Sequence, residues 1–315
     1  MNIVILDQNT VSIGDIDLSV FDKLGNVKYF DAMENELVAE NIGEADAVIL
    51  NKAIITKDII NKCPNLKYIG LFATGYNNVD TLYARKRGIV VCNAPNYSTD
   101  SVVQQVFALL LQISTSTDKY AKSVRNGEWI LSPTFSYFPY PIIELSGKTM
   151  GIVGFGSIGK KVAEVAKAFG MKVIVNTRTI PEKSEYTFVS KTELFEKSDV
   201  ISLNCPLTSE TEKMINEDAI SHMKENTVII NTSRGGTIDE AALAKALKDK
   251  RIFAAGLDVL TKEPMEKNCP LKCSDNCTIT PHIAWASLEA RQRLVKLVYK
   301  NLECFIEGKP INAVN

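Results

Sequence analysis

The sequence predicts an α/β protein made of two doubly wound parallel-sheet domains with a cleft between them. The first observation is the length, because 315 residues exceed the usual size of one domain and suit two. The second is a repeated alternation of short apolar runs with amphipathic segments, which is typical of parallel sheets covered by helices. The third is the composition, 45% hydrophobic and 23% charged, which is that of a globular chain with a large core.

The first part of the chain contains four strand-like apolar runs separated by helical or loop segments. They span residues 3–6, 47–50, 68–71 and 89–91. A longer helix is then expected to begin at Ser98-Thr99-Asp100-Ser101, because these residue types cap helix N-termini. Its apolar residues recur at helical spacing as far as Ile113, which predicts a buried helix between the domains.

An aromatic, proline-containing stretch over residues 129–141 follows, and it has little periodicity. We expect an extended arm whose aromatic side chains cover a partner subunit. The alternation then resumes with six strand-like runs, which predict a second complete α/β unit. They span residues 149–153, 172–175, 200–203, 227–230, 254–257 and 278–279. A final helix is expected over residues 286–306 and, since no strand follows it, to return to the first domain.

The charge pattern argues against several classes of partner. The formal net charge is -1 and the Lys and Arg residues are scattered, so no basic face is available for nucleic acid or anionic lipid. The N-terminus passes straight into an apolar run, and we expect no secretory signal. The longest apolar stretch, residues 106–113, is far shorter than the roughly 20 residues of a membrane span. A cytoplasmic location is therefore expected.

The cysteines are dispersed, and their count of 7 is odd, which favours reduced thiols over a disulfide framework. Cys269, Cys273 and Cys277 form the one cluster, and three thiolates can in principle hold a metal ion. Zinc ligands, however, usually come as C-x2-C pairs with four donors in total. We interpret the cluster as structural and predict no metal site.

The strongest local motif is a glycine-rich turn directly after an apolar run. Gly154, Gly156 and Gly159 have the G-x-G-x-x-G spacing, with Ser157 and Ile158 where the next helix begins. In this spacing the first glycine permits a tight turn, the second admits a pyrophosphate, and the third packs helix on strand. The helix N-terminus offers free amides to the phosphates. Because a strand, helix and second strand surround the turn, the sequence predicts a Rossmann-type site for NAD or NADP.

The second strand of this unit ends in Asn176-Thr177-Arg178, where NAD-binding domains usually carry an acidic residue for the ribose. No carboxylate is present there to repel a 2′-phosphate. The Arg178 guanidinium can stack on adenine or pair with that phosphate. The sequence therefore favours NADP over NAD, with Thr177 and Arg178 as contacts. The alternative is a solvated Arg178 in a protein that uses NAD.

Three polar residues near predicted strand ends supply a cation, a carboxylate and an imidazole: Arg234, Glu263 and His282. Reduction of a 2-oxo acid requires a cation for the carboxylate, a proton donor for the carbonyl oxygen and a group that keeps the donor protonated. The trio is predicted to be catalytic. The alternative for Arg234 and Glu263 is an ordinary solvated position.

With the glycine turn upstream, these segments resemble the D-isomer-specific 2-hydroxyacid dehydrogenase family, and within it the glycerate dehydrogenases and hydroxypyruvate reductases. Two further segments match: ATGYNNVD at 73–80 is similar to the family's substrate loop, and NCPLT at 204–208, with Glu210 and Thr211, to its cofactor-side loop. The resemblance covers nearly the whole chain. Several independent motifs in the right order make it specific.

The resemblance implies a role for each member of the trio. Arg234 would grip the carboxylate and the carbonyl oxygen of the substrate, and His282 would donate the proton as hydride arrives. Glu263 would pair with His282, because a carboxylate beside an imidazole favours its charged form. Formate dehydrogenases of the family carry glutamine where Glu263 stands, which disfavours formate as the substrate.

The resemblance also implies binding residues outside the trio. Backbone amides around Ala73, Thr74 and Gly75 would bind the substrate carboxylate, and Lys52 is a weak further candidate whose alternative is solvation. Asp258 would orient the nicotinamide carboxamide. The remaining implied cofactor contacts, on the loops after two predicted strands, are Cys205, Pro206, Thr211, Thr232 and Ser233.

The implied activity is hydride transfer between NAD(P)H and a small 2-oxo or D-2-hydroxy acid, with hydroxypyruvate/D-glycerate or glyoxylate/glycolate as the expected pairs. Residues 1–98 with 286–315 would form the substrate-binding domain, and residues 99–285 the dinucleotide-binding domain. A homodimer through the dinucleotide-binding domain is expected. Two alternatives stay open: a dinucleotide-sensing corepressor-like scaffold of the same fold, and a D-lactate-type dehydrogenase.

Overall fold

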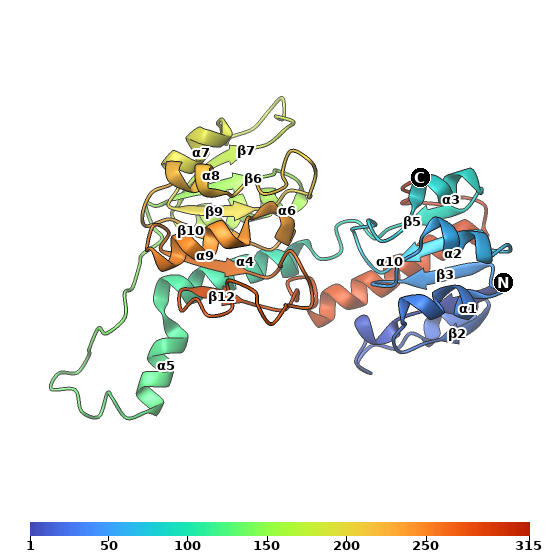
Figure 1. Cartoon of the computed structure of the whole chain (residues 1–315), viewed down its shortest axis with the longest axis horizontal. Helices are drawn as coiled ribbons and strands as arrows, with labels where there is room; N and C mark the ends of the chain where they lie inside the picture. Colours follow the sequence, from blue (N-terminus) through green and yellow to red (C-terminus); the bar gives the residue numbers. More distant parts are fainter. The chain divides into compact units, whose positions relative to one another are not determined.

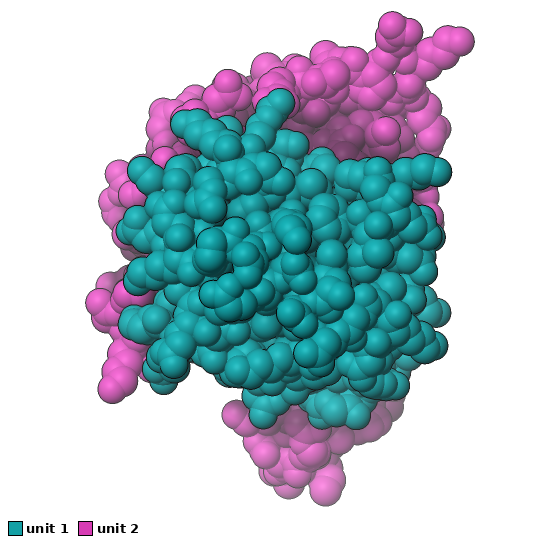
Figure 2. All heavy atoms as spheres, turned by 90° about the vertical axis from the view of Figure 1, so that its right-hand side faces the viewer, with its two compact units in different colours: residues 1–98, 285–315 teal, residues 99–284 magenta.

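The structure is a computed structural model that describes all residues, 1–315. The chain divides into two compact units, drawn in different colours in Figure 2. The first unit is discontinuous and contains Met1–Ser98 and Trp285–Asn315. The second is the continuous segment Thr99–Ala284.

The first unit contains a parallel sheet of five strands in the order β2-β1-β3-β4-β5. The strands are β1 (Asn2–Ile5), β2 (Asn26–Tyr29), β3 (Ala47–Leu50), β4 (Tyr68–Leu71) and β5 (Val90–Cys92). Strands β3 and β4 are buried at every position, as expected for the centre of a parallel sheet. Strand β2 was not predicted, because it lies at the edge and its residues, Asn-Val-Lys-Tyr, alternate between exposed and half-buried.

Helices cover this sheet, and the last of them comes from the C-terminal end of the chain. The α-helices are α1 (Val38–Ile42), α2 (Lys57–Lys62), α3 (Thr81–Lys86) and α10 (Leu288–Ile306), and the 3-10 helices are η1 (Gln8–Thr10), η2 (Ser19–Leu24) and η3 (Asn35–Leu37). Ser287 caps the N-terminus of helix α10, because its hydroxyl accepts from the Ala290 amide. A row of its side chains at i, i+4 spacing is fully buried in the core of this unit: Ala290, Leu294, Val298 and Leu302.

A bidentate ion pair joins α10 to the N-terminal segment. Arg291 donates through Nη1 and Nη2 to the two carboxylate oxygens of Asp15, at 2.8 and 2.6 Å. The hydrogen bond from Arg291 lowers the pKa of Asp15 to about 2. A carboxyl group whose pKa is lower in the folded state stabilises the fold above its unfolded pKa, and this stabilisation is lost as the pH falls through the folded value.

We therefore expect Asp15→Asn to lower the melting temperature at pH 7 by roughly 1–2 °C, the range of an exposed ion pair in a protein of this size. The difference from the unmodified protein should shrink as the pH falls from about 4 towards 2, since Asp15 is protonated first in the unfolded state and then, near pH 2, in the folded state. Thermal melts at several pH values measure this, with the exposed Glu225→Gln as control. A constant difference across that range would contradict the assignment.

The second unit contains a parallel sheet of seven strands in the order β12-β11-β10-β9-β6-β7-β8. The strands are β6 (Thr149–Val153), β7 (Lys172–Asn176), β8 (Thr187–Phe188), β9 (Val200–Leu203), β10 (Val228–Asn231), β11 (Ala254–Leu257) and β12 (Cys277–Ile279). The direction of winding reverses between β6 and β9, and such a switch point is where open α/β sheets bind ligands. Strand β8, two residues at the edge, was not predicted.

Helices cover both faces of this sheet. The helices of this unit are α4 (Thr99–Thr115), α5 (Thr117–Arg125), α6 (Ser157–Ala168), α7 (Lys191–Lys197), α8 (Glu217–His222), α9 (Glu240–Lys248) and the 3-10 helix η4 (Gly235–Thr237). Helices α4 and α6 share one core cluster, and α7, α8 and α9 share another on the opposite face. The predicted fold class is therefore confirmed: both sheets are parallel, with helices packed on them.

Helix α5 and the segment after it, residues 126–144, project from the second unit (Figure 1). We call residues 126–144 the arm. Its large apolar side chains lie largely in solvent: Ile130, Leu131, Phe135 and Phe138 are 77–90% exposed. No helix of the chain is both long enough and apolar enough to cross a membrane.

Candidate functional site

The glycine turn connects β6 to α6 at the switch point. Gly154 has a φ of +90°, a conformation that favours glycine, and a Cβ there would lie 2.5 Å from the Asn204 carbonyl oxygen. A Cβ on Gly159 would lie 2.1 Å from the Gly154 carbonyl oxygen. Neither position can carry a side chain without moving backbone. The two glycines thus allow the loop after β9 and helix α6 to lie directly against the end of β6.

The same turn fits a dinucleotide. A Cβ on Gly156 would meet no atom within 4 Å, so the space beside its backbone is open. Helix α6 begins at Ser157, and the first amides of a helix, here those of Ser157, Ile158 and Gly159, have no partner within it. Open space next to unpaired amides is what a pyrophosphate requires. Nearby, Asn204 Oδ1 is a buried acceptor without a partner in the protein.

The residues after β7 lie beside this turn, because β6 and β7 are paired and the Gly154 amide donates to the Asn176 carbonyl at 2.8 Å. Thr177 is half-buried and Arg178 is exposed. The Arg178 guanidinium forms no hydrogen bond or ion pair within the chain. It is therefore available for an anionic group of a ligand bound at the turn.

We expect Arg178→Ala to weaken the binding of NADPH by about tenfold and that of NADH by less than about twofold, because a charge-assisted hydrogen bond to the 2′-phosphate would be lost. Quenching of intrinsic fluorescence on titration with each dinucleotide measures this. The matched control is Arg125→Ala, at the end of α5. Equal weakening of both dinucleotides would mean that Arg178 only stacks on adenine, as in the alternative interpretation.

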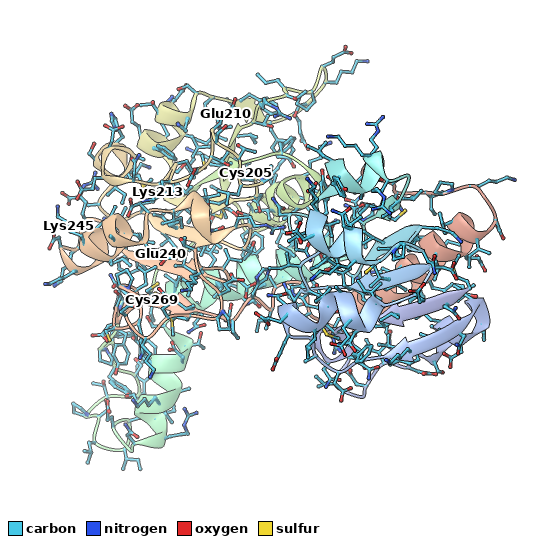
Figure 3. The ribbon with its side chains drawn as sticks, turned by 45° about the vertical axis from the view of Figure 1, so that its right-hand side comes forward. Cys205, Glu210, Lys213, Glu240, Lys245 and Cys269 are labelled. Carbon is cyan, nitrogen blue, oxygen red and sulfur yellow. The ribbon has the colours of Figure 1, made fainter.

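The loop after β9 carries Cys205, Pro206 and Thr211. The Thr211 hydroxyl donates to the Pro206 carbonyl at 2.7 Å and accepts from the Thr208 amide at 2.8 Å, which fixes the shape of the loop. Cys205, labelled in Figure 3, is 8% exposed and packs in the core beside Met214, and burial raises the pKa of its thiol. A contact between Cys205 and a cofactor would therefore involve its backbone.

Arg234 lies on the loop after β10, together with Thr232 and Ser233, and all three are half-buried. The fully buried Asn231 organises this loop, because its Nδ2 donates to the Arg234 carbonyl at 2.9 Å and its Oδ1 accepts from the Ser233 amide at 3.0 Å. The guanidinium of Arg234 donates through Nη1 to the Ser233 carbonyl at 2.7 Å. Its other nitrogens make no hydrogen bond within the chain.

Gly235 lets this loop lie against the next one. A Cβ there would lie 1.9 Å from the Leu260 carbonyl carbon, so only glycine fits. The loop that begins at Leu260 carries Glu263, and it is tied to α9 because the Thr261 amide donates to Glu240 Oε1 at 2.6 Å. Glu240, at the first position of α9, is labelled in Figure 3. The loops of Arg234 and Glu263 are thus neighbours.

Glu263 and His282 form a direct pair. His282 Nδ1 lies 2.6 Å from Glu263 Oε2, and Glu263 Oε1 accepts from the Leu260 amide at 2.9 Å. The side chains of Glu263 and His282 are 35% and 29% exposed. Since Nδ1 faces the carboxylate, the proton on Nδ1 is the one shared with Glu263, and Nε2 makes no hydrogen bond within the chain.

Asp258 lies directly after β11 and is 1% exposed. Its carboxylate accepts hydrogen bonds from the loop that carries His282. Its oxygens accept from the Thr280 hydroxyl at 2.5 Å and from the Ile283 and Ala284 amides at 3.0 and 2.8 Å. Burial raises the pKa of Asp258. Its expected contact with a nicotinamide carboxamide stays a prediction.

In the first unit, the loops after β4 and β5 are joined by three hydrogen bonds. Ala73 accepts at its carbonyl from the Ala94 amide, the Thr74 hydroxyl donates to the Ala94 carbonyl, and Asn93 Nδ2 donates to the Thr74 carbonyl, at 2.7–2.8 Å. The amides of Thr74 and Gly75 make no hydrogen bond within the chain. These two donors are therefore free to bind an anionic group.

Sequence reasoning missed Asp7, which organises the loop of Lys52. The Asp7 carboxylate is buried and accepts from the amides of Asn51, Lys52 and Ala53 at 2.6–3.0 Å. Asn78 then joins this loop to the one after β4, because its Nδ2 donates to the Asn51 and Ala53 carbonyls. The signal was available, since Asp7 follows the first apolar run as the other site residues follow theirs. The Lys52 side chain is exposed.

The cysteine cluster lies near β12. Cys273 is exposed, Cys269 and Cys277 are partly buried, and all seven cysteines are free thiols. Burial raises the pKa of Cys277 to about 12. The chain contains no group of three or more His, Cys, Asp or Glu side chains placed to hold a metal ion. The other histidine, His222 at the end of α8, is exposed.

The fold and site together define the class of protein. A glycine turn at the switch point of a parallel sheet has the geometry of a dinucleotide site, and loops after β10, β11 and β12 bring an arginine, a carboxylate and an imidazole to the same edge. A carboxylate–imidazole pair next to a dinucleotide site is the arrangement of a nicotinamide-dependent oxidoreductase.

Comparison with known proteins gives the family. The model of the "D-isomer specific 2-hydroxyacid dehydrogenase, NAD binding domain" family matches residues 107–284. The chain belongs to the D-isomer specific 2-hydroxyacid dehydrogenase family. The predicted resemblance is therefore confirmed, and with it the assignment as an NAD(P)-dependent oxidoreductase of this family.

Several individual proteins are similar to the chain over most or all of its length. The chain is 41% identical to a hydroxypyruvate reductase of Blautia hydrogenotrophica, with 100% of both chains covered. It is 39% identical to a glycerate dehydrogenase of Methylorubrum extorquens, with 91% of both covered. Among solved structures, an acyclic imino acid reductase in complex with NADPH and D-Arg has a TM-score of 0.90 and 33% identity over 100% of both chains.

Proposed function

We propose that this protein reduces a small 2-oxo acid, hydroxypyruvate or glyoxylate, to the corresponding D-2-hydroxy acid, D-glycerate or glycolate, with NADH or NADPH. The observation that carries the proposal is the Glu263–His282 pair at 2.6 Å, on loops that lie beside the loop of Arg234. The names of full-length relatives at 39–41% identity support the substrate.

Each member of the trio has a definite task in this proposal. A bound reduced nicotinamide supplies the hydride. Arg234 binds the carboxylate and carbonyl oxygen of the substrate through the guanidinium nitrogens that the protein leaves free. His282 donates a proton from Nε2 to the carbonyl oxygen, and Glu263 holds the imidazole in orientation through Nδ1. In the reverse direction His282 accepts the hydroxyl proton.

The binding roles are assigned in the same way. The pyrophosphate would be held by Gly154, Gly156 and the first amides of α6. The loops after β7, β9 and β10 would contact the rest of the dinucleotide. The free amides of Thr74 and Gly75 are assigned to the substrate carboxylate. On this basis the unit Thr99–Ala284 is the dinucleotide-binding domain, and the other unit is the substrate-binding domain. Reduced thiols at all seven cysteines support a cytoplasmic location.

The test is the initial rate of nicotinamide oxidation with hydroxypyruvate, glyoxylate and pyruvate, each with NADH and with NADPH. Fast oxidation with hydroxypyruvate or glyoxylate is the expected result, and preference for pyruvate would instead support a D-lactate-type dehydrogenase. Parallel reactions with added amine control for imine reduction, because one relative of this fold is an imino acid reductase. Oxidation only in the presence of amine would overturn the proposal. Dinucleotide binding without any oxidation would favour the sensing scaffold.

The proposed assembly is a homodimer in which the arm covers a second copy of the chain. The exposed apolar side chains of the arm are too large and too numerous for a surface that remains solvent-exposed. They cluster within one segment: Ile130, Leu131, Phe135 and Phe138. Small-molecule substrate and dinucleotide are the only other partners proposed.

We expect the double substitution Ile130→Glu/Leu131→Glu to convert the dimer to a monomer, because two charges would have to be buried at the interface. Sedimentation velocity or light scattering coupled to size exclusion measures the mass. The control is Ile180→Glu, an exposed apolar position outside the arm. If the unmodified chain is monomeric at micromolar concentration, the assembly is wrong, whereas a dimer that survives the double substitution would mean that another surface is used.

A further inference from the structure

The loop that holds His282 has a strained backbone, which some other part of the protein must keep in place. His282 has a φ of +57°, in the left-handed region that non-glycine residues seldom adopt. Such conformations persist when the surrounding structure determines them. The His282 amide donates to the carbonyls of Asp258 and Thr280 at 2.8 and 3.0 Å, so the loop closes on itself at the histidine.

The first turns of α4, more than 170 residues earlier in the chain, hold both ends of this loop. Ser101 Oγ donates to the Ala284 carbonyl at 2.6 Å. Gln105 Nε2 donates to Thr280 Oγ1 at 3.1 Å. Because Ser101 and Gln105 are four residues apart, they lie on one face of α4, one turn above the other.

The bond from Gln105 sets the direction of a short chain of hydrogen bonds. A threonine hydroxyl has one proton, and when it accepts from an amide its proton is free for another acceptor. Thr280 Oγ1 lies 2.5 Å from Asp258 Oδ1, so the proton is directed to that carboxylate. The order is therefore Gln105 to Thr280 to Asp258, and Asp258 in turn accepts from the amides on both residues that follow His282.

We propose that Gln105 is a positioning residue for the proton donor: its side-chain amide orients the Thr280 hydroxyl towards Asp258 and so holds His282 in its left-handed conformation. The inference rests on the proposed function of His282 as proton donor. Gln105 acts through Thr280 and Asp258, and its own amide contacts neither Glu263 nor the His282 imidazole.

The sharpest variant is Gln105→Glu, because glutamate matches glutamine in size and helix propensity but cannot donate a hydrogen bond when ionised. The carboxylate would accept the Thr280 proton and leave Asp258 with one donor fewer. The matched control is Gln104→Glu, the neighbouring residue on the exposed side of α4. We expect kcat to fall about tenfold in Gln105→Glu, the effect of about one hydrogen bond, with KM and dinucleotide affinity within about twofold. Gln104→Glu should not change kcat.

A double-mutant cycle tests whether Gln105 acts on His282 through the Thr280 hydroxyl. In a Thr280→Val background the hydroxyl is absent, so Gln105→Glu should have no further effect on kcat. Additive losses would mean that Gln105 does not act through Thr280 and would overturn the proposal. A merely structural role would give a different result, because general destabilisation would raise KM and lower dinucleotide affinity and melting temperature together with kcat.

A second measurement does not depend on turnover. The chain contains 2 histidines, so a histidine-selective NMR spectrum has two sets of imidazole signals, and His222→Ala assigns them. Gln105→Glu should shift or broaden the His282 signals and leave those of His222 unchanged. Unchanged His282 signals would overturn the positioning role. If the unmodified chain oxidises no nicotinamide, the proposed function fails, while the NMR result still decides whether Gln105 positions His282.

Discussion

Replacing His282 is expected to lower kcat by about 10²–10⁴-fold, the contribution of a positioned general acid, while NADH and NADPH still bind within about twofold. The reason is that Glu263 engages Nδ1 at 2.6 Å, so Nε2 of the same ring is the proposed proton donor that substitution removes. Steady-state rates with the best 2-oxo acid and fluorescence titration of the dinucleotide measure the two effects. His222→Ala is the control, because it removes the other histidine of the chain.

The choice of residue matters, since His282 has a positive φ. Alanine is strained there, whereas asparagine adopts the left-handed conformation more readily. His282→Asn therefore separates loss of the imidazole from distortion of the loop, and it should be as inactive as His282→Ala but melt at a higher temperature. If His282→Asn keeps kcat near that of the unmodified protein, another group donates the proton and the assignment is wrong.

The parts of the fold that were predicted from sequence are those in which burial dominates. The central strands β3, β4, β9 and β11 are buried at every position, so their apolar runs coincide with their bounds. Both missed strands lie at sheet edges. Strand β2 was missed because every second residue is exposed, and strand β8 because it has only 2 residues. Their pairing depends on the neighbouring strand more than on their own residues.

The candidate site shows the same division. Apart from Asp7, polar residues that follow buried strands could be singled out as candidates, because parallel strands bring their carboxyl ends to one edge. The hydrogen bonds that shape the loops could not be predicted, because they join residues that are far apart in the sequence. Gln105 and Thr280, for example, are 175 positions apart. The left-handed φ of His282 is likewise set by the closed loop and is not marked by any local sequence pattern.

The second large effect is expected at Arg234. Its carbonyl is held by Asn231 Nδ2 at 2.9 Å and by the Thr237 hydroxyl at 2.7 Å, and its Nη1 is held by the Ser233 carbonyl, so the guanidinium has a fixed place. Lysine keeps the charge but offers no planar fork that can bond Ser233 and a substrate carboxylate at once.

We expect Arg234→Lys to lower kcat/KM about 10–100-fold, mainly through a higher KM for the 2-oxo acid, because a hydrogen bond to a charged group is lost. Arg234→Met, which also removes the charge, should lower kcat/KM further, since nothing then opposes the charge that develops on the carbonyl oxygen. Dinucleotide affinity should change in neither variant, which distinguishes a substrate contact from collapse of the loop, and Arg87→Lys controls for the loss of an exposed arginine. A kcat/KM for Arg234→Met equal to that of the unmodified protein would remove Arg234 from the site and leave the free amides of Thr74 and Gly75 as the carboxylate's binding groups.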